Sequence, residues 1–378
     1  MVLSEVVSKS VQQGSGEEFP SEKTGAETVR HVPVLLREVL DALAVPASGD
    51  GFALLLDATL GGGGHSQALL SKFNALFVIG IEQDGDSLSR AEKRLSSFAG
   101  RLFCLHGNFS QIEEHLASVP AELRERLRKF RTPFPRFDRI LVDLGISSDQ
   151  LDEHQRGFSF NSDAPLDMRM NQHSSRSAAT LVNLSSYEEL KCLFQEGGVG
   201  EASGALARAI VQDRPFTSTR ALAEVCANVV RSFQRRRGKP ATAKMKDRQR
   251  NPSGNPATVP FQAVRIAVNG ELEVLKSFLA VIPRLLVPGG LAAFISFHSL
   301  EDQLVARAMR AWSRPVFAAR HLAHPGRTGA LGTLLHKHAV FAGEEEITGN
   351  PRARSARMRV FERNDTALDS TEHGRSLK

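Results

Sequence analysis

Short apolar runs alternate with turns and helical segments in the first part of this chain, and this alternation limits the fold more than any other feature. The runs have the length of strands and lie at residues 52–56, 76–81, 101–105 and 140–142. Between the second and third runs, apolar residues recur at helical spacing at Leu88, Ala91, Leu95 and Phe98. Strands that alternate with helices pair in parallel, so we predict an α/β fold: a doubly wound sheet with helices on both faces.

A helical segment interrupts this alternation. From residue 151 to 259 only helical patterns occur, at 185–194, 205–211 and 218–230. One long amphipathic helix over 261–279 and an apolar strand over 291–297 then resume the α/β pattern. We therefore predict one α/β domain made of residues 31–150 and 260–378, a helical insertion over 151–259, and a flexible tail over 1–30.

Positive charge is concentrated at the end of the predicted insertion. The 378-residue chain has a net charge of +6, and residues 231–250 contain nine Lys or Arg and one acid. Gly and Pro in and after this stretch predict a basic loop over 231–255. Such a loop is either a solvated linker or an arm that contacts the phosphates of a nucleic acid.

Composition excludes several classes of protein. No apolar stretch approaches the roughly 20 residues of a membrane-spanning helix. The first 30 residues contain five acids, which argues against a secretory signal or an Arg-rich transit peptide. The cysteines at 104, 192 and 226 form no C-x-x-C pair, and we expect reduced core thiols. These features favour the bacterial cytoplasm, with an organellar matrix as the alternative.

A glycine-rich turn at residues 57–66 joins the first strand to a helix, and Glu82 ends the second strand. Four glycines in such a turn let a ligand approach the main chain closely. No Lys follows them, as a P-loop requires, and Ser66 stands where a dinucleotide fingerprint has its third glycine. S-adenosylmethionine has no phosphate and needs only a glycine turn and an acid for its ribose, whereas NAD or FAD is a poorly supported alternative. A purely structural turn is a further alternative.

Polar residues also follow the fourth predicted strand. Because ligands bind at the carboxyl ends of strands in open parallel sheets, we expect Asp143 and Gln150 to lie beside the cofactor. The next segment, Arg156-Gly-Phe-Ser-Phe160, is suited to place a cation and aromatic faces around an unpaired base. Alternatively, Phe158 and Phe160 are ordinary core aromatics.

These segments closely resemble the bacterial 16S ribosomal RNA cytosine-N4 methyltransferase family. The resemblance extends from His31 to Glu362. It is carried by the glycine turn and by the segments at 31–36, 106–109, 143–152, 156–160, 165–170, 256–266, 295–302 and 350–355.

The resemblance implies a class I methyltransferase fold with a helical insertion and S-adenosylmethionine as methyl donor. It implies a decoding-site cytosine of small-subunit rRNA as acceptor, and the assembling small subunit as partner; a homodimer is a further hypothesis. The implied donor contacts are Gly63, Gly64, His65, Glu82, Phe109, Asp143 and Gln150. We expect RNA contacts from Arg156, Phe158, Phe160, Arg169, Arg265, His298, Arg235, Arg236 and Arg237.

For catalysis, the exocyclic amine of cytosine must be held in line with the donor methyl, and Asp143 is the candidate acceptor of an N4–H bond. The chain contains no Pro-Pro dipeptide, which weakens an assignment to DNA amino-methyltransferases. We attribute the acids after His298 to a helix capped by Ser299 and expect no metal.

The chain departs from the family pattern near the insertion. Gly198-Val-Gly-Glu201 replaces the usual G-E-E-R element, Val259 replaces an arginine, and the basic stretch is longer than usual. These changes keep a second hypothesis open: a ribosome-assembly factor that has this fold but little or no activity.

Overall fold

The computed structural model describes residues 32–45, 53–127, 136–236, 254–317 and 327–364. The predicted tail, His31, Arg237 and most of the basic loop lie outside these residues. The strands are β1 (Ala53–Asp57), β2 (Leu76–Glu82), β3 (Leu102–His106), β4 (Phe137–Asp143), β5 (Leu286–Ser296), β6 (Val316–Phe317), β7 (Arg327–Thr328), β8 (Gly332–Leu334), β9 (Val340–Phe341) and β10 (Arg357–Arg363).

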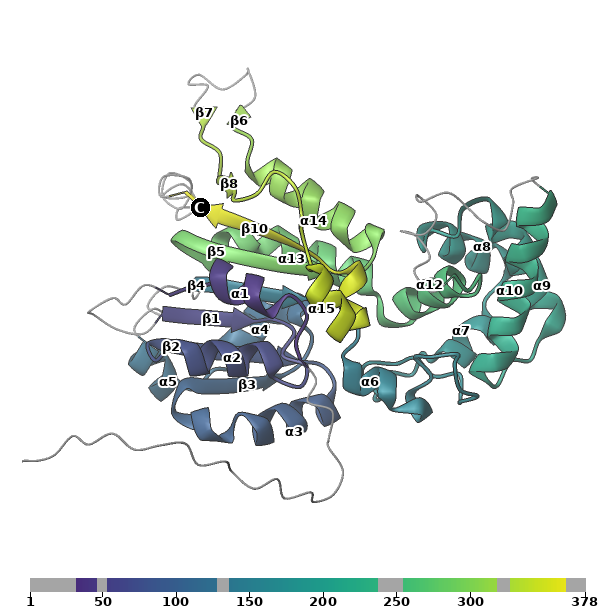
Figure 1. Cartoon of the computed structure of the whole chain (residues 1–378), viewed down its shortest axis with the longest axis horizontal. Helices are drawn as coiled ribbons and strands as arrows, with labels where there is room; N and C mark the ends of the chain where they lie inside the picture. The colour runs from purple at the N-terminus through teal and green to yellow at the C-terminus, as the bar shows by residue number, and fades with distance from the viewer. Residues whose placement is uncertain (1–31, 46–52, 128–135, 237–253, 318–326, 365–378) are drawn as a thin grey trace, which may run out of the picture. The chain divides into compact units, whose positions relative to one another are not determined.

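The main sheet has the order β3-β2-β1-β4-β5-β10-β8, with β9 also on β10 (Figure 1). Strands β1 to β5 are parallel, whereas β10 is antiparallel to β5. The register pairs Asp57 with Leu141 and Asp143 with Ile295. The polar residues that end β1, β2 and β4 therefore lie along one edge of the sheet, as predicted for a ligand-binding edge.

Helices cover both faces of this sheet, so the predicted doubly wound α/β class is confirmed. The helices of the sheet domain are α1 (Leu36–Ala42), α2 (Gly64–Lys72), α3 (Gly85–Arg94), α4 (Ile112–Ala117), α5 (Ala121–Leu127), α13 (Glu271–Leu285), α14 (Ser299–Trp312) and α15 (Glu344–Gly349).

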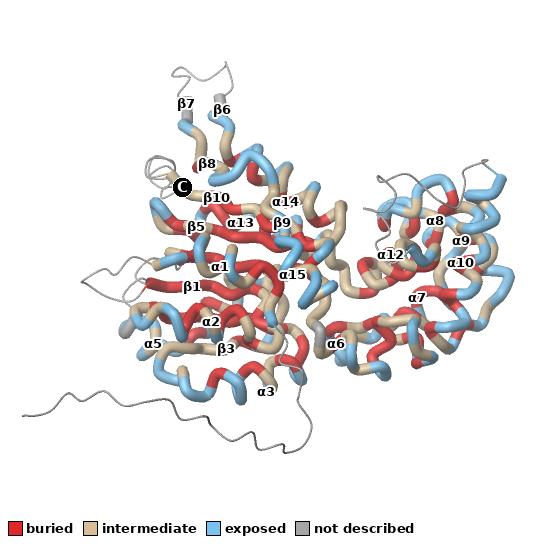
Figure 2. The backbone as a smooth tube through the Cα atoms, viewed as in Figure 1, coloured by how far each residue is buried: buried red, intermediate tan, exposed pale blue. Residues whose placement is uncertain are grey.

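Alternate residues of each strand feed two separate cores. Leu54 and Leu56 pack with α4, α13 and α14, whereas Leu55 packs with α1, α2 and α3. Figure 2 shows the central strands buried along their length. Burial on both faces explains why these strands have continuous apolar runs in the sequence.

The insertion contains α6 (Ser148–Asp152), α7 (Ala178–Leu184), α8 (Tyr187–Glu196), α9 (Ser203–Asp213) and α10 (Thr219–Arg236). They are followed by α12 (Thr258–Asn269). A separate hydrophobic core includes Leu190, Leu206 and Leu222, and α12 contributes Phe261 and Val264 to it. Helix α12 therefore packs with the insertion, although the sequence pattern placed it in the α/β domain. We propose that the boundary lies at Gly270 instead of residue 260.

The single long helix predicted over 261–279 is wrong in one respect. The helix is interrupted at Gly270, whose φ of 60° is left-handed, and this interruption separates α12 from α13. The apolar spacing continues across the break because α12 packs on the insertion core and α13 on the sheet. Periodicity alone could not show that two different partners take up the two halves.

Strand β5 begins earlier than predicted. Phe137 pairs with Leu286 and Arg139 with Leu291, so the Pro-Gly-Gly segment forms a bulge within the strand instead of ending the helix. The antiparallel strand β10 was not predicted, because its alternating charged and apolar residues belong to a strand covered less completely.

Cys226 is buried, Cys104 is half-buried and Cys192 is exposed, and all three are free. The expectation of core thiols is therefore wrong for Cys192. Among the helices described, none combines the length and apolar character needed to cross a membrane.

Candidate functional site

The glycine turn after β1 is packed tightly by protein atoms. Gly63 caps α2 with a φ of 78°, and a Cβ there would lie 2.8 Å from Cδ1 of Leu95. A Cβ on Gly64 would lie 2.7 Å from Cγ of Pro33. Gly63 is therefore required by its backbone conformation and by packing, and Gly64 by packing, in addition to any approach of a ligand.

Two hydrogen bonds to the buried carboxylate of Asp57 hold the start of this turn. The Ser66 hydroxyl donates to Asp57 Oδ2 at 2.6 Å, and the Thr59 amide donates to Asp57 Oδ1 at 3.3 Å. Burial raises the pKa of Asp57 to about 6, although both hydrogen bonds favour the carboxylate. Asp57 was not singled out from the sequence, although it is the polar residue that ends β1.

Glu82 connects the turn to the next strand. Its carboxylate accepts the amide of Gly61 and the amide of Asp84, both at 2.8 Å. Burial raises the pKa of Glu82 to about 7, although these amides lower it. Each carboxylate oxygen has a second lone pair, so the side chain can still accept hydrogen bonds from a ribose.

The raised pKa predicts a pH effect on stability. Between the ordinary pKa of 4.5 and about 7, the unfolded state loses this proton while the folded state keeps it. The Glu82 contribution to the free energy of unfolding should therefore fall as pH rises through this window and stay constant above it. Urea unfolding of wild type and Glu82→Gln should show their difference changing only in that window. The exposed Glu188→Gln is the control, and a difference independent of pH would contradict the assignment.

Asp143 is the least satisfied polar group at the sheet edge. Its amide donates to Thr59 Oγ1 at 2.6 Å, and its Oδ2 lies 3.6 Å from Nδ1 of His65. His65 Nε2 lies 2.9 Å from the carbonyl oxygen of Val34. The other oxygen, Asp143 Oδ1, is buried and has no hydrogen-bond partner among the described residues. Burial, together with Asp57 and Glu301, raises the pKa of Asp143 well above its ordinary value.

Gln150 and Arg156 converge on Asp84, which caps α3. Gln150 Nε2 donates to Asp84 Oδ2 at 2.6 Å, and Arg156 Nη1 lies 2.9 Å from the same oxygen. Gln150 Oε1 accepts the Ser147 amide in a capping box at the start of α6. Asp84 was missed from the sequence, although its place two residues after Glu82 and directly before a helix is a cap signal.

Phe109 follows β3, and its ring centroid lies 5.0 Å from that of Phe278 on α13. The structure thus brings the glycine turn, Glu82, Asp143 and Gln150 into one hydrogen-bonded edge. Phe109 is anchored on a neighbouring core.

Comparison with known proteins decides the family. The model of the MraW methylase family matches residues 28–364. The chain belongs to the MraW methylase family. Three relatives, each named ribosomal RNA small subunit methyltransferase H, come from Synechococcus elongatus, Nitratiruptor and Nitratidesulfovibrio vulgaris. They are 39%, 36% and 38% identical to this chain over 334, 336 and 349 residues. These alignments cover 88%, 88% and 92% of this chain and 94%, 98% and 99% of the relatives.

Membership of the MraW methylase family confirms that the chain is a methyltransferase, and S-adenosylmethionine is its methyl donor. The residues at the sheet edge fit this donor by their chemistry. A sulfonium is cationic, and Asp143 Oδ1 is a buried carboxylate oxygen at that edge to which the described part of the chain offers no hydrogen bond.

Several side chains expected to contact RNA are instead used within the protein. Only 8% of the Arg156 side chain is exposed, and Nη2 also donates to the carbonyl oxygens of Arg169 and Met170. Arg156 therefore has little guanidinium surface left for RNA, which corrects the expectation from its Arg-Gly-Phe segment.

The two phenylalanines of that segment fit the core alternative. Phe158 is buried in the insertion core, and Phe160 packs edge-on against Phe261 with ring centroids 5.1 Å apart. Arg169 is bound by both oxygens of Asp167. Arg235 and Arg236 are exposed on the last turn of α10.

Arg265 and His298 lie in one polar cluster with Glu271 and Glu301. Arg265 makes a bidentate pair with Glu271, with both hydrogen bonds at 2.8 Å. His298, not Ser299, caps α14: its Nδ1 accepts the Glu301 amide at 3.3 Å. Glu271 was missed as a site residue, because nothing in the sequence shows that α13 begins beside the end of β5. Glu301 was assigned to the start of the helix after His298, and its place in the capping box of α14 confirms this.

The element at 198–201, which departs from the family pattern, packs locally within the described part of the insertion. Val199 packs against the insertion core, and Gly200 has a φ of 74° with open space around its Cβ position. Gly198 approaches Leu300 at the start of α14. The altered element is therefore accommodated by local packing next to the polar cluster.

Proposed function

We propose that the protein transfers the methyl group of S-adenosylmethionine to the exocyclic N4 amine of a decoding-site cytosine in small-subunit rRNA. The observation that carries the proposal is the buried oxygen of Asp143, which has no hydrogen-bond partner among the described residues and lies at the carboxyl edge of the sheet, next to the glycine turn. The names of the curated relatives support rRNA of the small subunit as substrate.

In this proposal each residue of the sheet edge contacts a different part of S-adenosylmethionine. Asp143 faces the positive charge of the donor, Glu82 accepts hydrogen bonds from its ribose, and Gly63, Gly64 and His65 shape the turn around its methionine part. Gln150 and Phe109 complete the site next to the adenine. The donor itself supplies a methyl group bonded to a positively charged sulfur.

The acceptor amine needs help because its lone pair is delocalised into the ring. As the N4–CH₃ bond forms, the S–CH₃ bond breaks and its electron pair stays on sulfur, so one N4 proton must leave. We propose that Asp143 accepts this N4–H. Burial raises the pKa of Asp143 well above its ordinary value, which makes its carboxylate a stronger base. Correct positioning is worth about 7–11 kcal/mol of the barrier.

We also propose that the exposed end of α10 contacts RNA phosphates. Each phosphate contact to single-stranded RNA contributes about 0.7 to the slope of log affinity against log salt. Changing Arg235 and Arg236 to glutamine should therefore weaken binding and reduce this slope by about 1 to 2. The control is Arg37→Gln, because that side chain is 91% exposed on α1. An unchanged slope in the double variant would mean that this end of α10 and the basic loop form only a linker.

Two finer proposals concern the setting of the protein. We propose the bacterial cytoplasm as its compartment, supported by three free cysteines and by relatives from bacteria. We also propose a homodimer. Light scattering on the purified protein tests this, and the mass of a monomer would contradict it.

Methyl transfer to immature small ribosomal subunits tests the function directly. Subunits incubated with the protein and labelled S-adenosylmethionine should yield N4-methylcytidine after digestion to nucleosides and mass spectrometry. Label on another nucleoside would overturn the proposed acceptor. Donor binding without transfer to any subunit would favour the assembly-factor hypothesis.

A further inference from the structure

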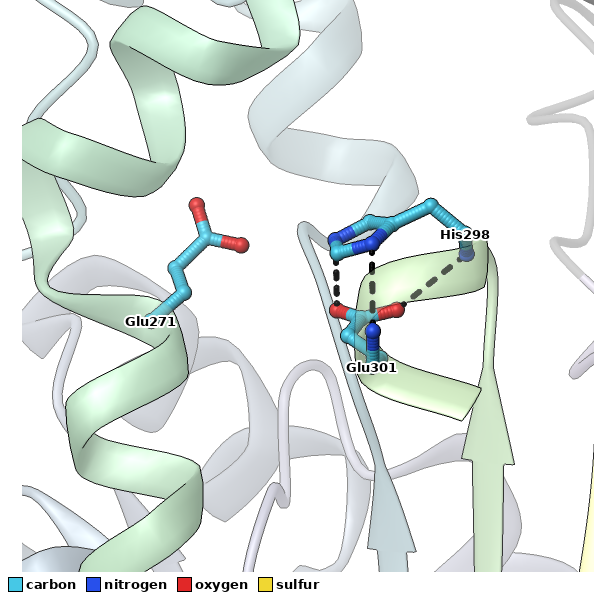
Figure 3. Close-up of side chains that lie close together, drawn as sticks. All are labelled: Glu271, His298 and Glu301. Atoms are coloured by element: carbon cyan, nitrogen blue, oxygen red, sulfur yellow. Dashed lines mark hydrogen bonds and ion pairs between the residues drawn. The ribbon is translucent and has the colours of Figure 1, made fainter. Parts of the chain in front are cut away.

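Four polar side chains meet beyond the carboxyl edge of β5. Arg265 lies on α12 and Glu271 begins α13, whereas His298 and Glu301 lie where β5 joins α14. Candidate ligand atoms of Glu271, His298 and Glu301 all lie within 4.8 Å of one another. Figure 3 shows the Glu271 carboxylate pointing toward His298 and Glu301, while the dashed contacts join only the latter two.

Both carboxylates of this cluster accept hydrogen bonds from groups of the protein. Arg265 donates to both oxygens of Glu271, and Glu301 Oε2 accepts the amides of Phe297 and His298 at 2.9 and 3.3 Å. Burial raises the pKa of Glu301, but His298 and Arg265 outweigh this and leave it below its ordinary value. Glu271 keeps lone pairs that its guanidinium partner does not use, so it can accept a further hydrogen bond.

His298 supplies a donor. Because Nδ1 accepts the Glu301 amide, the ring proton of the neutral imidazole lies on Nε2. Nε2 is buried and lies 3.2 Å from Glu301 Oε1, but it makes no hydrogen bond among the described residues. The cluster thus combines a fixed acceptor, Glu271, with an unsatisfied donor, His298.

The cluster lies next to the proposed site of methyl transfer. Strand β5 pairs with β4 so that Ile295 is opposite Asp143, and His298 follows three residues later. The charge of Glu301 is also among the causes that raise the pKa of Asp143.

We propose that Glu271 and His298 bind the base-pairing edge of the acceptor cytosine. The Glu271 carboxylate accepts one N–H of the exocyclic amine, and His298 Nε2–H donates to the ring nitrogen N3. The second N–H of the amine faces Asp143. Glu301 is a positioning residue that orients His298 through their reciprocal cap. This inference rests on the proposed function and deepens it, because it names what selects the base.

The combination of an acceptor on Glu271 and a donor on His298 explains how cytosine would be selected over uracil. Cytosine presents a donor, N4–H, beside an acceptor, N3; uracil presents the acceptor O4 beside the donor N3–H. A Glu271 carboxylate oxygen and a ring nitrogen of His298 lie within 4.8 Å of each other, a separation that lets the two side chains reach adjacent groups of one base through bonds of about 2.9 Å. With uracil, the carboxylate would face O4 and Nε2–H would face N3–H, so both contacts would be repulsive.

Glu271, His298 and Glu301 could also be read as ligands of a metal ion. The Arg265 guanidinium, bonded to both oxygens of Glu271, places a positive charge where a cation would bind. His298 Nδ1 and Glu301 Oε2 are already hydrogen-bonded within the protein. The positive charge of Arg265 and the hydrogen bonds already made by these ligand atoms therefore favour a nucleic-acid base over a cation.

The test is base discrimination, measured on immature small subunits whose acceptor cytosine has first been mapped by the transfer assay. Binding to these subunits is compared with binding to subunits in which that cytosine is replaced by uridine. Wild type should prefer cytosine by about tenfold or more. In Glu271→Gln the amide can donate to O4, so the preference should fall to about twofold or less. A role in folding alone would weaken binding to both subunits alike.

Two further variants keep the result interpretable. Glu273→Gln, an exposed change two residues along α13, should keep the wild-type preference. His298→Ser retains a good helix cap but is too short to reach a base, so it should weaken binding to cytosine subunits about tenfold and leave S-adenosylmethionine affinity unchanged.

Undiminished cytosine preference in Glu271→Gln would overturn the inference, as would unchanged affinity in His298→Ser. So would stoichiometric Zn²⁺ binding that Glu271→Gln abolishes, together with loss of base preference in EDTA. The proposed function fails separately, if wild type transfers no methyl group to cytosine.

Discussion

Replacing Arg156 with methionine is expected to lower the free energy of unfolding by about 3–5 kcal/mol, because it leaves a buried charge unpaired. The Arg156 guanidinium lies 2.9 Å from the Asp84 carboxylate, and these side chains are 8% and 2% exposed. The change also removes hydrogen bonds to two main-chain carbonyl groups. Urea unfolding monitored by circular dichroism measures the effect.

Two comparisons isolate the cause. Adding Asp84→Asn to Arg156→Met should recover part of the loss, since the double variant has no unpaired charge. Arg37→Met, at an exposed arginine whose nearest carboxylate is 4.0 Å away, should change stability by about 0.5 kcal/mol or less. If Arg156→Met lowered the free energy of unfolding by less than about 1 kcal/mol, Arg156 would behave as an exposed residue that is available for RNA contact.

Changing Asp143 to asparagine is expected to stabilise the protein without donor and to weaken donor binding. One buried oxygen of the carboxylate has no hydrogen-bond partner within the described ranges of the chain, and Asp57 and Glu301 oppose its charge. Removing that charge should raise the free energy of unfolding by about 1–2 kcal/mol. The same change removes the negative charge proposed to face the sulfonium, so S-adenosylmethionine affinity should fall about tenfold or more, and methyl transfer about a hundredfold.

A variant that is more stable but binds S-adenosylmethionine more weakly shows that the replaced side chain serves binding and not folding. Thermal unfolding and calorimetric titration on the same sample give both values, and Asp41→Asn at an exposed position on α1 should change neither. If Asp143→Asn lost stability and kept full donor affinity, Asp143 would be a structural residue of the sheet edge.

The sheet could be predicted where burial is uniform. Strands β1, β2 and β4 are covered on both faces, so their apolar runs stand out, and the polar residue after each strand marks the binding edge. The break at Gly270 could not be predicted, because apolar spacing reports burial and not the identity of the packing partner.

The RNA-binding side chains were harder to predict than the donor site for a related reason. Donor residues follow strands directly, so position in the chain fixes position in space. Arg156 has the sequence surroundings of an RNA contact, but Asp84, distant in the sequence, pairs with it. Glu271 meets His298 only through the packing of α13 against the sheet.

Binding of S-adenosylmethionine to the full-length protein, measured by isothermal titration calorimetry, tests the central claim most directly. We predict one donor molecule per chain, displaced by S-adenosylhomocysteine and bound about tenfold or more weakly by Asp143→Asn. No heat of binding to wild type, or equal affinity in the variant, would contradict the placement of the methyl donor beside Asp143.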